Sequence, residues 1–167
     1  IGVLLTLIVG WYIASFLNVE PESVSFNSSR AYADVQTQVD FGPRIPGTDG
    51  HAQIRKWMQA ELEAAGWKVE VHESERLGHP IYNIIAKRNA EPPQIILGAH
   101  YDTRMIADND PDLTKRTEPV PGANDGASGV AVLLELARSL PNDTVPVWLV
   151  FFDTEDKPIE TPPAPET

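Results

Sequence analysis

Residues 126–152 read GASGVAVLLELARSLPNDTVPVWLVFF, and this stretch indicates the fold class. Its first half places apolar residues one helical turn apart, which predicts an amphipathic helix with Val130, Leu133, Leu134 and Ala137 on one face. Its second half ends in VPVWLVFF, a continuous apolar run that predicts a buried strand. A helix followed directly by a buried strand is typical of an α/β domain.

The preceding sequence continues this alternation. A helix is expected between a cap at Thr48 or Asp49 and a stop at Gly66, with its apolar face made by Ile54, Met58 and Leu62. A short helix is expected over residues 31–40, and strands over residues 67–73, 82–88 and 94–100. The apolar run of the last strand predicts burial on both of its faces. The predicted fold class is therefore α/β, with a sheet that is at least partly parallel in its centre.

The composition narrows the class of function. The chain has 167 residues, enough for one domain, and a formal net charge of -11 at pH 7. Nucleic-acid binding needs clustered lysine and arginine, so we expect no nucleic-acid partner. The sequence contains no cysteine, so any metal ion must be held by histidine, aspartate and glutamate side chains.

The first segment of the chain, residues 1–17, is apolar and carries no charge. It is slightly shorter than the roughly 20 residues that span a bilayer, and it fits a signal peptide, a signal anchor or a buried core helix. Residues 18–30 are polar and are expected to form an exported tether. The sequence therefore predicts a protein that is anchored in a membrane through residues 1–17 and faces outward, or one that is secreted or periplasmic.

Polar residues with possible roles in chemistry stand at the ends of the predicted strands. His100 and Asp102 lie two residues apart in GAHYDT, a spacing that puts both side chains on one face of an extended backbone. Histidine is a zinc ligand, and a nearby carboxylate can fix its orientation. The alternative is a pair of local hydrogen-bonding groups at the end of a strand.

Three carboxylates occupy comparable places. Asp125, in PGANDGASG, stands where it can cap the next helix or reach a site through the close approach that glycine allows. Glu155 and Asp156 follow the last apolar strand in FFDTED, where ligands bind in open α/β sheets; the alternative is an acidic surface turn. Adjacent carboxylates can divide two roles, one binding metal and the other accepting a proton. Together the clusters suit a hydrolytic zinc site with open coordination positions.

Two further polar residues receive structural interpretations. His51, in the first turn of the predicted helix, is expected to be a solvated surface residue. Arg44 lies in FGPRIPGTDG, a turn shaped by proline and glycine, and it is expected to anchor this turn rather than to bind substrate.

Five motifs carry a resemblance to a known family. In chain order they are FGPRIPGTDGH, NIIAKR, GAHYDTR, PGANDGASGVAVLLELAR and WLVFFDTED. Over about residues 31–156 they resemble the zinc-dependent exopeptidases of peptidase family 28, which include bacterial aminopeptidases and glutaminyl-peptide cyclotransferases. The resemblance implies a three-layer α/β/α sandwich around a mixed, centrally parallel sheet.

The resemblance also implies a role for each residue of the clusters. His100 matches a zinc ligand of the two-zinc aminopeptidases, and Asp102 matches the carboxylate that orients it. Asp125 matches the carboxylate that bridges two zinc ions or binds the single zinc ion of the cyclotransferases. Glu155 matches the general base. Asp156 matches a metal-binding glutamate, and it departs from the commonest pattern because aspartate is one methylene shorter.

The implied cofactor is zinc, as one or two ions, and the implied substrates are the N-termini of peptides or proteins. The implied activity is that of an aminopeptidase, with Glu155 taking a proton from zinc-activated water. The alternative is a glutaminyl-peptide cyclotransferase, which forms N-terminal pyroglutamate, because the shared motifs occur in both branches.

Part of the family pattern has no counterpart in this sequence. The family uses a further aspartate and a further histidine as metal ligands, but no histidine follows His100, and residues 157–167 are rich in proline and resemble nothing in the family. We therefore expect a family member that is truncated after the general-base strand, whose incomplete site binds metal weakly. The third interpretation is an inactive remnant.

Overall fold

The computed structural model describes residues 25–76, 79–89 and 91–156. The apolar segment at residues 1–17, most of the tether and the segment at residues 157–167 lie outside this range. Within it, no helix has the length and apolar character needed to cross a membrane.

The described chain forms one mixed four-stranded sheet with helices beside it. The helices are α2 (Ser28–Asp40), α3 (Asp49–Ala64) and α4 (Ser128–Ser139), with two short helical segments, η1 (Leu113–Lys115) and η2 (Ala123–Ala127). The strands are β1 (Lys68–Arg76), β2 (His79–Arg88), β3 (Ile95–His100) and β4 (Val147–Phe152). The predicted alternation of helices and strands is confirmed.

The sheet has the strand order β1-β2-β4-β3. β1 and β4 both pair with β2 in antiparallel fashion, whereas β3 and β4 are parallel, with Ile95 opposite Val147 and His100 opposite Phe152. The α/β class with a mixed sheet is therefore confirmed. The parallel pair matters most for function, because both of its strands end at the same edge of the sheet.

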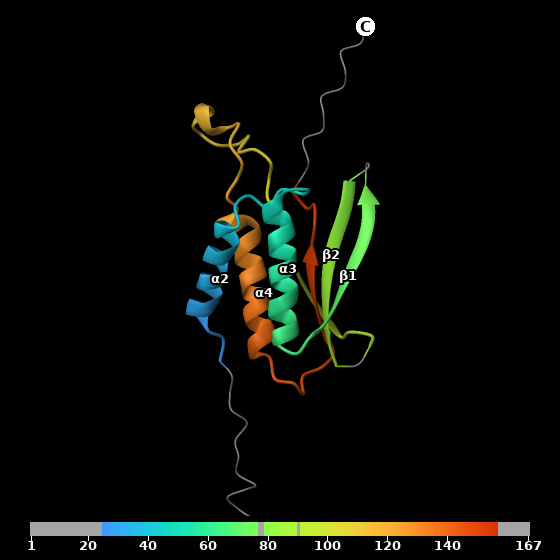
Figure 1. The fold of residues 1–167 in the computed structure, drawn as a ribbon. Helices are drawn as coiled ribbons and strands as arrows, with labels where there is room; N and C mark the ends of the chain where they lie inside the picture. Colours follow the sequence, from blue (N-terminus) through green and yellow to red (C-terminus); the bar gives the residue numbers. More distant parts are fainter. Residues whose placement is uncertain (1–24, 77–78, 90, 157–167) are drawn as a thin grey trace, which may run out of the picture.

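Helices cover one face of the sheet (Figure 1). α3 and α4 pack against the strands, and α2 packs on α4. The core between these layers is apolar, because alternate strand residues point toward the helices. Its fully buried members include Ile54, Met58, Leu62, Ile84, Leu134, Leu149 and Phe151.

The opposite face of β3 is open among the described residues, so the expected burial of this strand on both faces is wrong. Ile96, which points away from the helices, is 57% exposed, and Phe152 on the neighbouring strand is 45% exposed. Ile95, on the helix side at the start of the strand, is also 44% exposed. An apolar strand sequence predicts that both faces of the strand are buried, but it does not indicate which part of the protein buries them.

Helix α2 begins at Ser28, three residues before the predicted start at residue 31, so the end of the predicted tether belongs to the fold. Asn27 caps the helix by accepting a hydrogen bond from the Arg30 amide. The Asn27 amide and the Arg30 guanidinium both donate to the buried carboxylate of Glu135 on α4. This pairing ties the first helix to the core.

Helix α3 follows its sequence signals closely. Thr48 caps it by accepting a hydrogen bond from the His51 amide, and the chain leaves the helix through Gly66 at a φ of 82°. Ile54, Met58 and Leu62 face the core as predicted. The first turn of α3 lies at the end of the sheet where β4, drawn in red, ends (Figure 1).

Candidate metal centre

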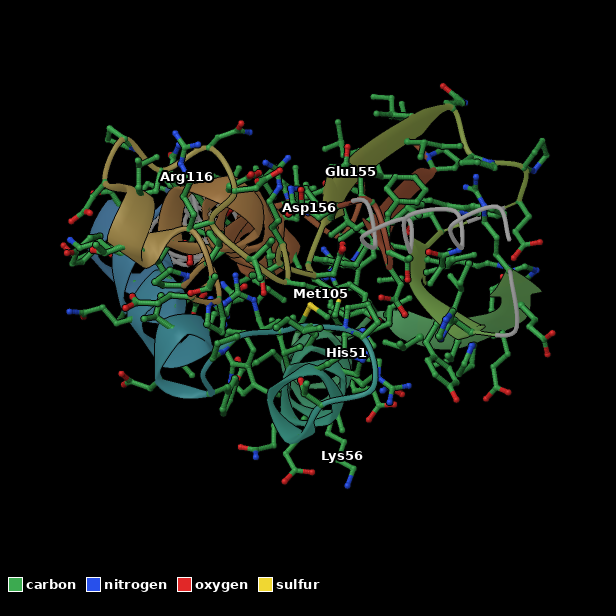
Figure 2. All side chains as sticks on the ribbon, turned by 90° about the horizontal axis from the view of Figure 1, so that it is seen from above. His51, Lys56, Met105, Arg116, Glu155 and Asp156 are labelled. Atoms are coloured by element: carbon green, nitrogen blue, oxygen red, sulfur yellow. The ribbon has the colours of Figure 1, made fainter. Side chains whose placement is uncertain are left out.

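The predicted site residues gather where β3 and β4 end. His100 is the last residue of β3, Glu155 and Asp156 follow β4, and Asp125 lies in η2, just before α4. Figure 2, which looks onto the molecule from above, shows Glu155 and Asp156 next to each other. The carboxyl ends of parallel strands meet at one edge of a sheet, which is where α/β proteins bind their ligands.

Three of these residues could share a metal ion. One donor atom each from His100, Asp125 and Asp156 lies within 4.8 Å of the other two. The His100 Nε2 atom is 3.0 Å from Asp125 Oδ1. The three residues come from three separate segments of the chain, so it is the fold that brings them together.

Asp102 connects this cluster to the turn that follows β4. Its carboxylate is fully buried and accepts hydrogen bonds from the amides of both Glu155, at 3.1 Å, and Asp156, at 3.0 Å. Its Oδ1 atom also lies 3.5 Å from His100 Nδ1, which is a close charge contact and too long for a good hydrogen bond. Asp102 thus lies beside His100, as predicted, and it also holds the amides of residues 155 and 156, which no sequence pattern indicates.

The electrostatics of the cluster favour a cation. Burial, followed by the negative charges of Asp125 and Asp102, raises the pKa of Asp156. The contact with Asp102 raises the pKa of His100 to about 9, although burial opposes this change, and Asp125 and Glu155 add to it. Neighbouring carboxylates contribute to both shifts: they add to the effect of burial at Asp156 and act against it at His100. A bound cation would relieve this crowding.

Asp125 lies at a break in the helix and does not cap it. Its backbone is extended, with a φ of -86° and a ψ of 113°, and Gly126 follows at a φ of 91°. Helix α4 then starts at Ser128 without any side-chain cap. The interpretation of Asp125 as a simple capping residue is therefore wrong, and its carboxylate is left available, with its side chain 66% exposed.

Arg44 holds together the segments that carry the cluster. Its side chain is completely buried, and its guanidinium donates to the carbonyl oxygens of Tyr101 at 3.0 Å, Pro121 at 3.1 Å and Gly122 at 2.6 Å. Its own amide donates to Thr103 Oγ1. The predicted anchoring role is confirmed. It extends beyond the turn itself to both ends of the segment that joins β3 to η2, residues 101–122, which we call the long loop.

The close packing around Arg44 leads to a first prediction. Gly122 has a φ of 67°, and a Cβ atom there would overlap Thr103 Cγ2 and lie 2.6 Å from Arg44 Nη2. We expect Gly122→Ala to lower the free energy of unfolding by about 3 kcal/mol, because backbone strain and overpacking add. Urea denaturation followed by circular dichroism measures the loss.

Gly42→Ala is the matched control for this prediction. Gly42 has a φ of 83°, but a Cβ atom there would meet nothing within 4 Å. Its substitution should therefore cost only the backbone term, about 1 kcal/mol. Equal losses for the two variants would contradict the packing argument.

Sequence reasoning missed one buried pair close to the site. His51 is 2% exposed, not solvated, and its Nε2 atom lies 2.7 Å from Asp153 Oδ1. The signal was present, because His51 precedes Ile54 by one helical turn and so extends the apolar face of α3. The expectation of a surface histidine is therefore wrong.

Arg104 was also missed. Its Nε atom lies 3.7 Å from Asp156 Oδ1, and its Nη1 atom donates to Asp108 at 3.0 Å. Arg104 thus places a cation at the rim of the cluster, at the start of the long loop. Arg104 is the last residue of the motif GAHYDTR, but nothing in the sequence links it to Asp156.

A cavity of about 650 Å³ lies far from this cluster. Its walls come from the last turn of α3, the start of β1 and the end of β2, including Ala64, Gly66, Lys68 and Arg88. These segments lie at the opposite end of the sheet from His100, so the cavity has no part in the chemistry of the cluster.

The residues present fit a zinc ion. Zinc in catalytic sites takes histidine nitrogen and carboxylate oxygen ligands and keeps open positions. The cluster offers one nitrogen and two carboxylates, and His100 Nδ1 is buried without a hydrogen-bond partner among the described residues. The donor set and the crowded negative charge therefore both match a divalent cation.

Comparison with known proteins agrees with this geometry. Residues 83–160 match the family model of peptidase family M28. The uncharacterized protein YfbL of Escherichia coli is 43% identical over 107 residues, which are 62% of this chain and 31% of YfbL. The chain thus spans about a third of the length of this curated relative.

Solved structures give the same result. A glutaminyl cyclase of Bacteroides thetaiotaomicron is 39% identical, with a TM-score of 0.76, over 86% of this chain and 51% of that chain. A zinc-dependent exopeptidase of Parabacteroides distasonis is 38% identical, with a TM-score of 0.74, over 80% of this chain and 49% of that chain. The similarity covers about half of each solved chain. Residues 83–160 therefore match peptidase family M28, and the described fold is similar to about half of a zinc-dependent exopeptidase or a glutaminyl cyclase.

Proposed function

We propose that this protein is a zinc-dependent enzyme that acts on the N-termini of peptides, with His100, Asp125 and Asp156 as its metal ligands. The observation that carries the proposal is the convergence of their donor atoms within 4.8 Å of one another, beside Glu155. Aminopeptidase-type hydrolysis is the first candidate reaction. The match to peptidase family M28 supports this class of chemistry.

A bound zinc ion would polarise a carbonyl group and lower the pKa of water at the site. The chain's own residues supply the remaining steps. Glu155 is the general base; its side chain is 62% exposed, so it can reach a substrate, and Oε2 lies 3.9 Å from His100 Nδ1. It accepts a proton from water and passes it to the leaving amine. Asp102 fixes the backbone from which Glu155 extends.

Glutaminyl-peptide cyclotransfer is the second candidate reaction. It is supported by the similarity to solved glutaminyl cyclases, one of them 42% identical with a TM-score of 0.74. In this reaction Glu155 moves a proton from the substrate's own α-amine, which attacks the side-chain amide of an N-terminal glutamine, and ammonia leaves. The same residues serve both reactions, and the substrate decides between them.

Two product assays test the proposal. The zinc-loaded protein is incubated with an aminoacyl-nitroanilide and, separately, with a glutaminyl peptide, and nitroaniline and ammonia are measured. Nitroaniline release alone supports the aminopeptidase, and ammonia release with a cyclised peptide product supports the cyclotransferase. Asp125→Asn is the control for contaminating activity. If the protein binds no zinc at all, the whole proposal is wrong.

Zinc binding should depend on pH in a defined direction. Only neutral imidazole binds zinc, and His100 has a pKa raised to about 9, so below this pH zinc must displace a proton. We expect the apparent zinc affinity to rise up to about tenfold per pH unit between about pH 6.5 and pH 8.5. Calorimetry in two buffers of different ionisation enthalpy counts the released proton. A zinc affinity that is constant across this range would contradict the prediction.

A further inference from the structure

The turn that carries Glu155 and Asp156 has an unusual backbone. Thr154, directly before Glu155, has a φ of 59°, in the left-handed region that a β-branched residue rarely adopts. Its Oγ1 atom is buried and has no hydrogen-bond partner among the described residues. A conformation of this kind persists only where surrounding contacts enforce it. Contacts on both sides of Thr154 enforce it here.

On the far side of Thr154, Asp102 holds the turn by its bonds to the 155 and 156 amides. On the near side, Asp153 is held from several directions. Its Oδ2 atom accepts the Tyr82 amide at 2.8 Å, and its own amide donates to Asn83 Oδ1 at 2.9 Å. The remaining oxygen, Oδ1, faces His51 at 2.7 Å. Thr154 is therefore fixed between two anchored carboxylates.

The buried position of His51 calls for an explanation. Both its side chain and that of Asp153 are almost completely buried, at 2% and 0% exposed. The imidazole stacks on Tyr101, with ring centroids 5.2 Å apart and an interplanar angle of 17°. A buried polar pair is costly unless it is well bonded, and an apolar residue would fill the same position on α3 more cheaply.

The pair also links distant parts of the chain. His51 comes from the first turn of α3, and Asp153 lies 102 residues later. Tyr101, which carries the stacked ring, directly follows His100 and donates its hydroxyl to the Tyr82 carbonyl. His51 lies on the α3 side of the turn in Figure 2, away from the cluster itself.

We propose that His51 is a positioning residue: through Asp153 it holds the turn at residues 153–156 so that Glu155 and Asp156 face the metal centre. The inference rests on the proposed function for its consequence at the metal, but its effect on the turn is measurable without metal. His51 itself contacts neither substrate nor metal. It acts on the site only through the backbone that carries the base and a ligand.

A matched pair of substitutions tests this inference. In His51→Gln the side-chain amide reaches the position of Nε2 and can donate to Asp153. In His51→Asn the same amide is one methylene shorter and cannot reach it. His79→Gln is the control, since His79 is exposed at the start of β2.

The first readout is amide hydrogen exchange in the metal-free chain. In His51→Asn we expect exchange at Glu155 and Asp156 to rise about tenfold or more, because the bond to Asp153 is lost. Exchange at core amides such as Leu134 on α4 should stay within about twofold. His51→Gln and His79→Gln should resemble the unsubstituted chain. The second readout is zinc affinity, expected to fall about 10–100-fold in His51→Asn and to recover in His51→Gln.

These readouts separate two kinds of failure. Unchanged exchange at residues 155 and 156 in His51→Asn overturns the inference, and so does a uniform rise that includes the α4 core. If His51→Asn does not fold, its hydrogen exchange cannot be compared with that of His51→Gln. Asp153→Asn is then measured in the same way, and the same two outcomes overturn the inference. If the exchange result holds but the unsubstituted chain binds no zinc, the positioning of the turn stands and the proposed function fails.

Discussion

Glu155→Gln should abolish turnover while leaving zinc bound. Glutamine keeps the size of the side chain but cannot accept a proton, and a general base contributes about 10²–10⁴-fold to the rate. We expect kcat to fall about 10³-fold and zinc affinity to change by less than about threefold. The product assay that detects activity in the unsubstituted protein measures the first quantity, and calorimetry measures the second.

The neighbouring residue provides the matched comparison. Asp156→Asn removes a charged ligand from the cluster, so it should weaken zinc binding by about 100-fold or more and lower activity at limiting zinc. Raising the zinc concentration should recover part of this activity, but none of the activity lost in Glu155→Gln. If zinc rescues Glu155→Gln, or if both variants lose zinc alike, the assignment of base and ligand is wrong.

Arg44→Met should produce the largest loss of stability. The substitution leaves the buried carbonyl oxygens of Tyr101 and Gly122, and the partly buried one of Pro121, without their donor. Burial lowers the pKa of Arg44 to about 10, so the side chain is still cationic at neutral pH and its hydrogen bonds are charge-assisted. Removing one partner of such a network costs about 3–5 kcal/mol. Urea denaturation measures the change.

Arg116→Met is the control for this measurement. Arg116 is exposed in the long loop, and within the described part of the chain its side chain makes one hydrogen bond, to the Asp110 carbonyl at 2.7 Å. Its loss should change the free energy of unfolding by no more than about 0.5 kcal/mol. A loss of less than about 1 kcal/mol for Arg44→Met would contradict the view that this side chain holds the segments of the site together.

The elements of the fold could be predicted because each leaves a local pattern. The apolar spacing in α3 and α4, the cap at Thr48 and the apolar run of β4 all depend on neighbours within a few residues. The cluster residues could also be listed, since they stand at strand ends and match the motifs of a family. The sequence could therefore identify the candidate site residues.

The geometry could not be predicted, because it depends on contacts between distant segments. The bonds from Asp102 to the 155 and 156 amides span more than 50 residues, with separations of 53 and 54. The bond between His51 and Asp153 spans 102 residues. The left-handed backbone at Thr154 could not be predicted from residue preferences, because threonine disfavours this conformation. Tertiary contacts enforce it against the local preference.

The two bonds that Asp102 accepts have a consequence for redesign. They hold the peptide groups of residues 155 and 156 and make no use of the side chains at these positions. The side chain at position 156 can therefore be exchanged without loss of the contacts that fix its backbone. Histidine would add a softer nitrogen donor, and glutamate a longer oxygen donor, which changes the order in which first-row metals compete for the centre. The metal preference of the centre can thus be changed at position 156 while the backbone of the turn stays the same.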